Sequence, residues 1–72
     1  MRVRGTVTEI LNPSVFLNCP SSDQSRLFEV EVTLLHPEEI TRLNRGQNLN
    51  AFGAVRDGNR LMIYLKDCTI SQ

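Results

Sequence analysis

The sequence has few residues of the kinds that build catalytic and metal sites. Its 72 residues include one histidine, two cysteines and no tryptophan. His36, Cys19 and Cys68 lie far apart in the chain, without the closely spaced cysteine or histidine pairs of zinc sites. No glycine-rich phosphate loop is recognisable, and no third group is evident that would orient a Cys–His pair. We therefore expect a protein that is not an enzyme and that holds no metal ion or cofactor.

The chain also lacks long apolar runs and a disulfide framework. No apolar stretch approaches the roughly 20 residues that span a bilayer. The first five residues lead directly into alternating sequence, whereas a signal peptide would need a continuous apolar segment there. Two cysteines are few for a disulfide scaffold, so we expect both to be small buried side chains. These absences predict a cytoplasmic protein without membrane contact.

The net charge is zero, but the charges are unevenly distributed along the chain. Residues 23–39 carry five carboxylates and one arginine, a net charge of −4, whereas residues 42–66 carry five cations and one aspartate, a net charge of +4. Seven of the eight cations are arginine, which stacks and pairs with phosphate better than lysine. A neutral chain excludes a strongly cationic coat for nucleic acid, but it is compatible with a local basic face. A mixed solvated surface is the alternative interpretation.

Alternation of apolar and polar residues predicts five β-strands. The clearest strand is residues 27–35, where Glu29 and Glu31 must face water because buried unpaired carboxylates are costly. This places the opposite parity of that strand in the core. Similar alternation predicts strands at residues 2–11, 15–19, 47–55 and 61–68. The residues expected to be mostly buried are Val7, Leu17, Phe28, Val30, Val32, Leu34, Leu49, Ile63 and Leu65.

The segment between the third and fourth strands has the pattern of a short helix. Pro37 suits a first helical turn, and Ile40 and Leu43 lie three residues apart on one face. Gly46 is suited to the left-handed conformation that follows many helices. We expect a helix of about two turns over residues 36–44, docked on the barrel because helices of that length are marginal alone.

The order of these elements is that of an OB barrel. Residues 56–59 predict a hairpin turn between the last two strands, since Asp-Gly supplies the positive φ of a tight turn. Gly5 and Gly53, inside strands, are typical of the bends of a small barrel. The sequence therefore predicts a single domain over residues 1–72. Its fold class is all-β with one short helix, a five-stranded OB-type barrel in the order β-β-β-α-β-β. Closure hides the sheet edges.

Three segments of the chain follow a recognisable family pattern. They are R-G-T-V-T-E-I near the start, L-N-R-G-Q-N-L-N-A-F-G-A-V in the middle and L-M-I-Y-L-K-D-C-T-I near the end. The informative parts are Gly46-Gln47 with Gly53, and Leu65, Asp67, Cys68 and Ile70. Over nearly its whole length the chain resembles the small bacterial OB domains of the tRNA anticodon-binding-like family. The resemblance implies an OB fold of bacterial or phage origin and favours a nucleic-acid ligand, but it leaves the ligand open.

Strand parity places aromatic and basic side chains on the outside of the barrel. Phe16, Phe52 and Tyr64 share the outward parity, so three of the four aromatic residues face outward. The candidate binding residues are Arg2, Arg4, Phe16, Phe52, Arg60, Tyr64 and Lys66. Exposed aromatics stack on bases with roughly 1–3 kcal/mol per base, and nearby cations pair with phosphates. We expect one continuous patch away from Glu29 and Glu31, whose stripe argues against nucleic acid on the third strand.

Three functions are compatible with these observations. The first is a non-catalytic nucleic-acid-binding module for single-stranded DNA or RNA, with salt-dependent affinity. The second is a protein-interaction module, an inhibitor or accessory subunit, that uses the exposed aromatics as anchors. The aromatics also have a purely structural interpretation, in which Phe52 packs under the helix as part of a small secondary core and has no binding role. The last function is small-anion binding, because residues 5–9 and 43–52 faintly resemble molybdate-binding barrel domains, although the final hairpin does not. We rank nucleic acid first.

Overall fold

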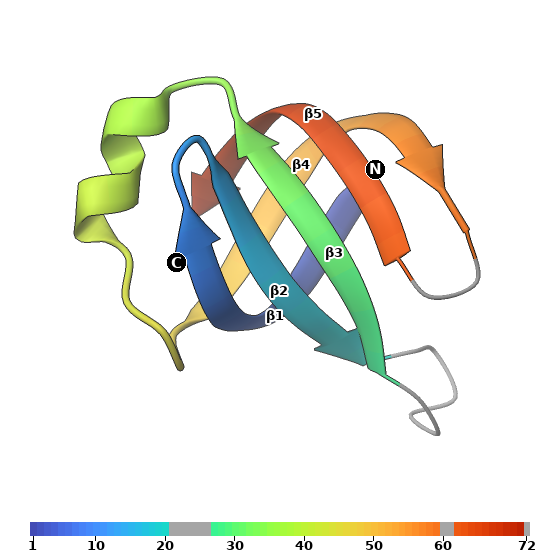
Figure 1. Cartoon of the computed structure of the whole chain (residues 1–72), viewed down its shortest axis with the longest axis horizontal. Helices are drawn as coiled ribbons and strands as arrows, with labels where there is room; N and C mark the ends of the chain where they lie inside the picture. The colour runs from blue at the N-terminus through green and yellow to red at the C-terminus, as the bar shows by residue number, and fades with distance from the viewer. Residues whose placement is uncertain (21–26, 60–61, 72) are drawn as a thin grey trace.

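The computed structural model describes residues 1–20, 27–59 and 62–71. The elements are β1 (Arg2–Leu11), β2 (Ser14–Pro20), β3 (Leu27–Leu34), a 3₁₀ helix η1 (Pro37–Arg42), β4 (Asn48–Gly58) and β5 (Met62–Ser71). The strands close into a barrel in the order β1-β2-β3-β5-β4, with β4 pairing back onto β1 (Figure 1). Only the β3–β5 pair is parallel among these neighbours. The predicted OB-type barrel and its element order are confirmed.

Aliphatic and cysteine side chains fill the barrel. The buried residues are Val3, Val7, Val15, Leu17, Cys19, Val30, Val32, Leu34, Leu43, Leu49, Ala51, Leu65 and Cys68. This set includes seven of the nine residues predicted for the core. Phe28 and Ile63 are less buried than the other seven, and Ile63 packs against this core. Phe28 is the second residue of β3, and Ile63 the second of β5, so both lie near a strand end instead of in the middle of the barrel.

The helix prediction is right in place and wrong in type. The amide of Glu39 donates to the His36 carbonyl at 3.0 Å, and that of Leu43 donates to the Ile40 carbonyl at 3.1 Å, which are 3₁₀ bonds. Because a 3₁₀ turn needs fewer residues than an α-helical turn, it suits a segment of only six residues. The helix docks as expected, because Leu43 is buried and Ile40 packs against the core. Gly46 has the predicted positive φ, at 88°.

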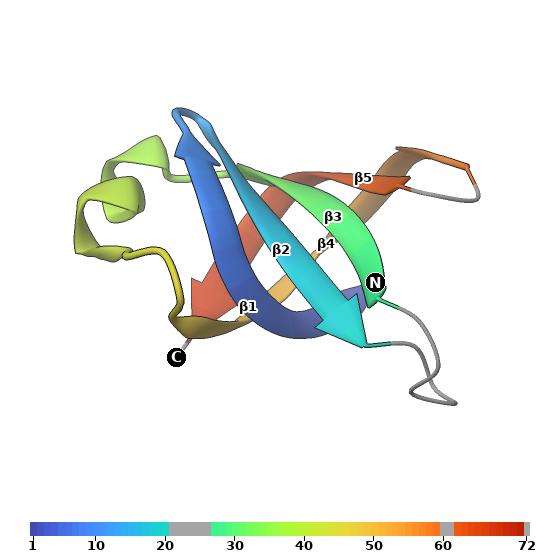
Figure 2. The same ribbon diagram turned by 60° about the horizontal axis from the view of Figure 1, so that its bottom comes forward.

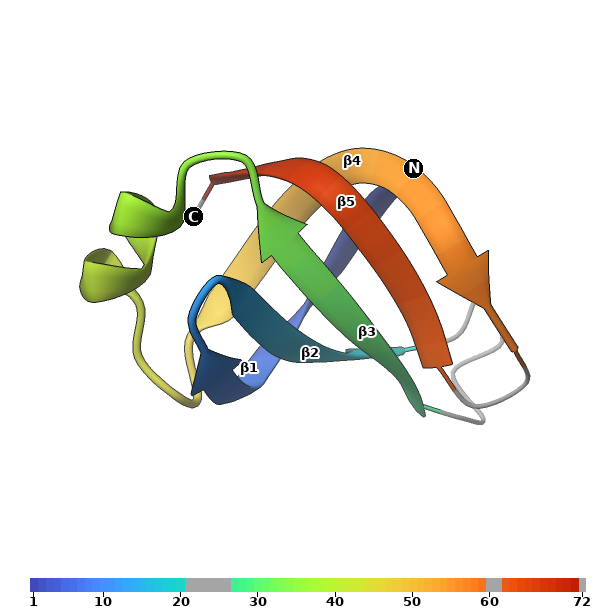
Figure 3. The same cartoon turned by 45° about the horizontal axis from the view of Figure 1, so that its top comes forward.

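The β4–β5 pair is longer than predicted. Register shifts lie between Phe52 and Ala54 and between Val55 and Asp57. The second shift leaves Arg56 unpaired within β4, so Asp57 and Gly58 still pair with β5 instead of turning. The predicted turn at residues 56–59 is therefore displaced toward Asn59, whose amide donates to the Met62 carbonyl at 2.9 Å. In the predicted strand 47–55, Val55 shares the inward parity of Leu49, Ala51 and Gly53, yet it is 56% exposed. This end of the hairpin and η1 lie at opposite ends of the barrel's long axis (Figures 1 and 3).

Two glycines allow neighbouring strands to approach each other closely. A Cβ at Gly5 would overlap the Asn18 carbonyl oxygen and lie 2.7 Å from the Cys19 sulfur. A Cβ at Gly53 would overlap the Cys68 sulfur. Gly53 also lies at the first register shift of β4, as predicted for a glycine at a barrel bend. Figure 2 shows the strong curvature of β1, which pairs with β4 over its first half and with β2 over its second.

Candidate functional site

The predicted binding residues separate into two groups on the barrel surface. Arg2 and Arg4 of β1 lie beside Phe52 of β4. Phe16 of β2 and Tyr64 of β5 lie elsewhere, on either side of β3. The expectation of a single continuous patch is therefore wrong, and each group has its own polar surroundings.

The first group forms a surface that we call the β1–β4 face. Its cross-strand pairs are Arg2 with Phe52, Arg4 with Asn50, and Thr6 with Asn48. Phe52 is 56% exposed, and both arginines are exposed. The purely structural interpretation of Phe52 is therefore wrong, because neither η1 nor a described loop covers its ring.

Two shallow depressions follow the β1–β4 face. The first, about 560 Å³, is lined by Arg2, Asn50, Ala51, Phe52, Thr69, Ile70 and Ser71. The second, about 440 Å³, is lined by Arg4, Gly5, Thr6, Thr8, Asn18, Pro20 and Asn48. The two adjoin where Arg4 pairs with Asn50. Among the described lining residues there are two arginines, several amides and hydroxyls, and no carboxylate. The asparagines were not singled out from the sequence, because only the β1–β4 register brings them beside the arginines.

The second group belongs to a row that crosses all five strands. Glu9 pairs with Phe16, Phe16 with Glu31, and Glu31 with Tyr64, which in turn pairs with Asp57. We call these five residues the acidic–aromatic row. Phe16 and Tyr64 were expected to lie away from Glu29 and Glu31, but both flank Glu31. The antiparallel β2–β3 pairing places Phe16 beside Glu31, and the parallel β3–β5 pairing places Tyr64 on its other side.

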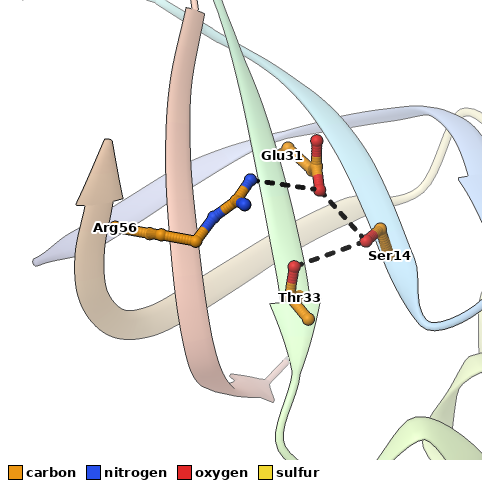
Figure 4. A network of polar contacts seen from close by, with 4 residues as sticks. All are labelled: Ser14, Glu31, Thr33 and Arg56. Carbon is orange, nitrogen blue, oxygen red and sulfur yellow. Dashed lines mark hydrogen bonds and ion pairs between the residues drawn. The ribbon is translucent and has the colours of Figure 1, made fainter. Parts of the chain in front are cut away.

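Arg56 covers part of this row. Its guanidinium carbon lies 5.1 Å from the centroid of the Tyr64 ring, and its Nη2 lies 3.8 Å from Glu31 Oε1. The Ser14 hydroxyl donates to the same Glu31 oxygen at 3.3 Å and lies 3.4 Å from the Thr33 hydroxyl. Figure 4 shows the Arg56 side chain passing over β5 to reach Glu31 on β3. The sequence did not indicate Arg56 as a site residue, since it was predicted to lie in a turn.

The remaining candidates are Lys66 and Arg60. Lys66 is exposed and lies opposite Ala54, two residues beyond Phe52 on β4. It therefore lies near the β1–β4 face but does not line either depression. Arg60 lies outside the described residues.

The two cysteines and the histidine lie in different surroundings. Cys19 and Cys68 are free and lie inside the barrel. Burial raises the pKa of Cys19 to about 11, and burial is also the main cause of a raised pKa for Cys68. A reactive thiol needs the opposite shift. His36 is exposed at the start of η1, with Nδ1 3.8 Å from Glu38 Oε1. The described ranges contain no group of three or more histidine, cysteine or acidic residues arranged for a metal ion.

In the described part of the chain, no helix has the length and apolar character needed to cross a membrane. Comparison with models of known families, with curated proteins and with solved structures found no match.

Proposed function

We propose that the protein binds single-stranded nucleic acid, DNA or RNA, across the β1–β4 face and carries out no catalysis. The observation that supports this best is the exposed Phe52, which lies opposite Arg2 across β1 and β4, in a depression without a described carboxylate. An aromatic platform beside cations is the arrangement by which OB folds hold single strands.

Each part of the face has a role in this proposal. The Phe52 ring stacks on a base. Arg2 and Arg4, two residues apart on one strand and thus about 7 Å apart, pair with successive phosphates. The amides of Asn48 and Asn50 supply donors and acceptors for base edges.

Charge favours this face over the one that OB domains commonly use. In many OB binders the ligand crosses the second and third strands. Here β3 carries Glu29, which is exposed, and the half-buried Glu31. These carboxylates repel phosphates, so the ligand is displaced toward β1 and β4.

A matched pair of arginine variants tests the proposal. Binding of a labelled single-stranded oligonucleotide of about eight nucleotides is measured between about 50 and 200 mM salt. Arg2→Gln should weaken binding and reduce the slope of log affinity against log salt by about 0.7, the value for one lost single-strand phosphate contact. Arg56→Gln removes the same charge from beside Tyr64, outside both depressions, and should leave that slope unchanged. Equal effects of the two variants, or no binding by the wild type, contradict the proposal.

A protein-interaction role is the second candidate function, favoured by the acidic–aromatic row, whose cross-strand pairs do not include the arginines of the β1–β4 face.

A further inference from the structure

We propose that the acidic–aromatic row docks an arginine-bearing segment of a protein partner, whose guanidinium groups take the position that Arg56 occupies over Tyr64. The proposal concerns residues other than those of the nucleic-acid interface and does not rest on it.

The row alternates carboxylates and rings across the barrel. Outward from the centre, Glu31 is flanked by Phe16 and Tyr64, and these rings are flanked by Glu9 and Asp57. Both rings are half-buried, so they are already held in place and lose little freedom on binding. A planar cation that enters this row finds an aromatic face and a carboxylate side by side. This combination suits guanidinium better than ammonium, because guanidinium stacks on rings and also pairs with carboxylates.

Arg56 demonstrates the contact within the chain itself. Its guanidinium lies over the Tyr64 ring and within 3.8 Å of the Glu31 carboxylate. The Ser14 hydroxyl, at 3.3 Å, helps to hold that carboxylate in place. The Arg56 side chain is 52% exposed, and exposed ion pairs contribute only about 0–1 kcal/mol. A partner arginine can therefore displace it at small cost.

Charge complementarity selects the occupant. Among the described residues, the exposed or half-buried Glu9, Glu29, Glu31 and Asp57 lie on or beside the row, Arg56 reaches Glu31, and the exposed Lys66 lies two residues from Tyr64 on β5. The surplus of carboxylates repels nucleic acid and attracts a basic segment. Tyrosine and arginine are also residues over-represented at protein interfaces. A basic protein segment is thus the partner that fits this surface.

A capped tri-arginine peptide is the probe, with a capped tri-lysine peptide of equal charge for comparison. Tyr64 is the only tyrosine, and the chain has no tryptophan, so intrinsic fluorescence reports this row alone. Tri-arginine should change the Tyr64 fluorescence and shift the amide resonances of Phe16, Glu31 and Tyr64, with several-fold higher affinity than tri-lysine. Absence of binding, equal affinity for the two peptides, or shifts confined to the acidic first turn of η1 would overturn the proposal.

Two pairs of variants separate this contact from general attraction of cations. Arg56→Gln removes the guanidinium that covers the Tyr64 ring. This change should tighten tri-arginine binding about two- to fivefold, the range for an exposed cation–π contact. Arg42→Gln removes the same charge from η1 and should change the affinity less. Glu31→Gln should weaken binding about fivefold, whereas Glu38→Gln, on η1, should not. An unchanged or weaker affinity for Arg56→Gln rejects the proposal, as does an equal effect within either pair.

Discussion

Arg2 lies directly opposite Phe52 across β1 and β4, and no described carboxylate lines the depression around them. The other outward ring with an arginine beside it, Tyr64, has Glu31 as its neighbour on β3. The described residues thus present a cross-strand arginine–aromatic pair and an arginine–ring contact, in opposite electrostatic settings. One setting suits phosphates, and the other suits cations.

Phe52→Ala should weaken binding of single-stranded oligonucleotides without destabilising the fold. The lost stacking of roughly 1–3 kcal/mol corresponds to about 5- to 150-fold in affinity. Because the Phe52 ring is 56% exposed, the free energy of unfolding should change by less than about 0.5 kcal/mol. Oligonucleotide titration and urea denaturation measure the two effects. A variant that binds as tightly as the wild type would show that the ring is not a stacking platform.

Leu49→Ala should destabilise the barrel more than Phe28→Ala. Leu49 is 0% exposed, and truncation of a buried leucine costs about 2–5 kcal/mol. Phe28 is half-buried near the start of β3, so its truncation leaves less of a cavity and should cost less than the roughly 3–5 kcal/mol of a buried phenylalanine. The midpoints of urea unfolding give the comparison. The reverse order would mean that Phe28 belongs to the central core.

Gly53→Ala should be far more damaging than Gly58→Ala. The new Cβ at position 53 would overlap the Cys68 sulfur and approach the Lys66 carbonyl oxygen to 2.7 Å. At Gly58 the nearest atom is the Met62 carbonyl oxygen at 3.8 Å, an ordinary contact. Overpacking of the first kind costs about 1–3 kcal/mol. Similar unfolding midpoints for the two variants would show that β5 does not approach β4 closely at Gly53.

The stability of the fold should fall as the pH rises above 9. The Cys19 thiol has an ordinary pKa of 9.0 and a folded pKa of about 11. Between these values the unfolded chain loses a proton that the folded chain retains, so the stabilisation is complete below pH 9 and decreases toward pH 11. The decrease is at most about 1.4 kcal/mol per pH unit for one group. Urea unfolding at about pH 8 and about pH 10 measures it. Cys19→Ala should show a smaller fall, and an equal fall in the variant would assign the effect to other groups.

The alternation of apolar and polar residues correctly predicted which side chains are buried within one regular strand. Val30, Val32 and Leu34 are buried as predicted, because their parity is set by the glutamates between them. The parity of Val55 failed, because a bulge shifts the register beside it. In β5 the buried residues Leu65 and Cys68 are three positions apart, so the inward parity changes between them. Asp67, which lies in this interval, has a positive φ of 51°. Periodicity does not reveal such shifts.

The candidate site was predicted only in part for a related reason. Parity correctly indicated that Phe52 faces outward, but it does not say which outward residues become neighbours around a barrel. That depends on strand register. The β3–β5 pairing brings Tyr64 beside Glu31, and the β1–β4 pairing brings Phe52 beside Arg2. Long-range pairing therefore divided a patch that parity alone predicted to be continuous.

The most direct test of the proposed function is an NMR titration of the ¹⁵N-labelled protein with a short single-stranded oligonucleotide of mixed sequence, at low and higher salt. The proposal predicts shifts at Arg2, Arg4, Asn50 and Phe52, with affinity that decreases as salt rises. Shifts centred on Glu31 and Tyr64, affinity independent of salt, or no shifts at all would contradict it.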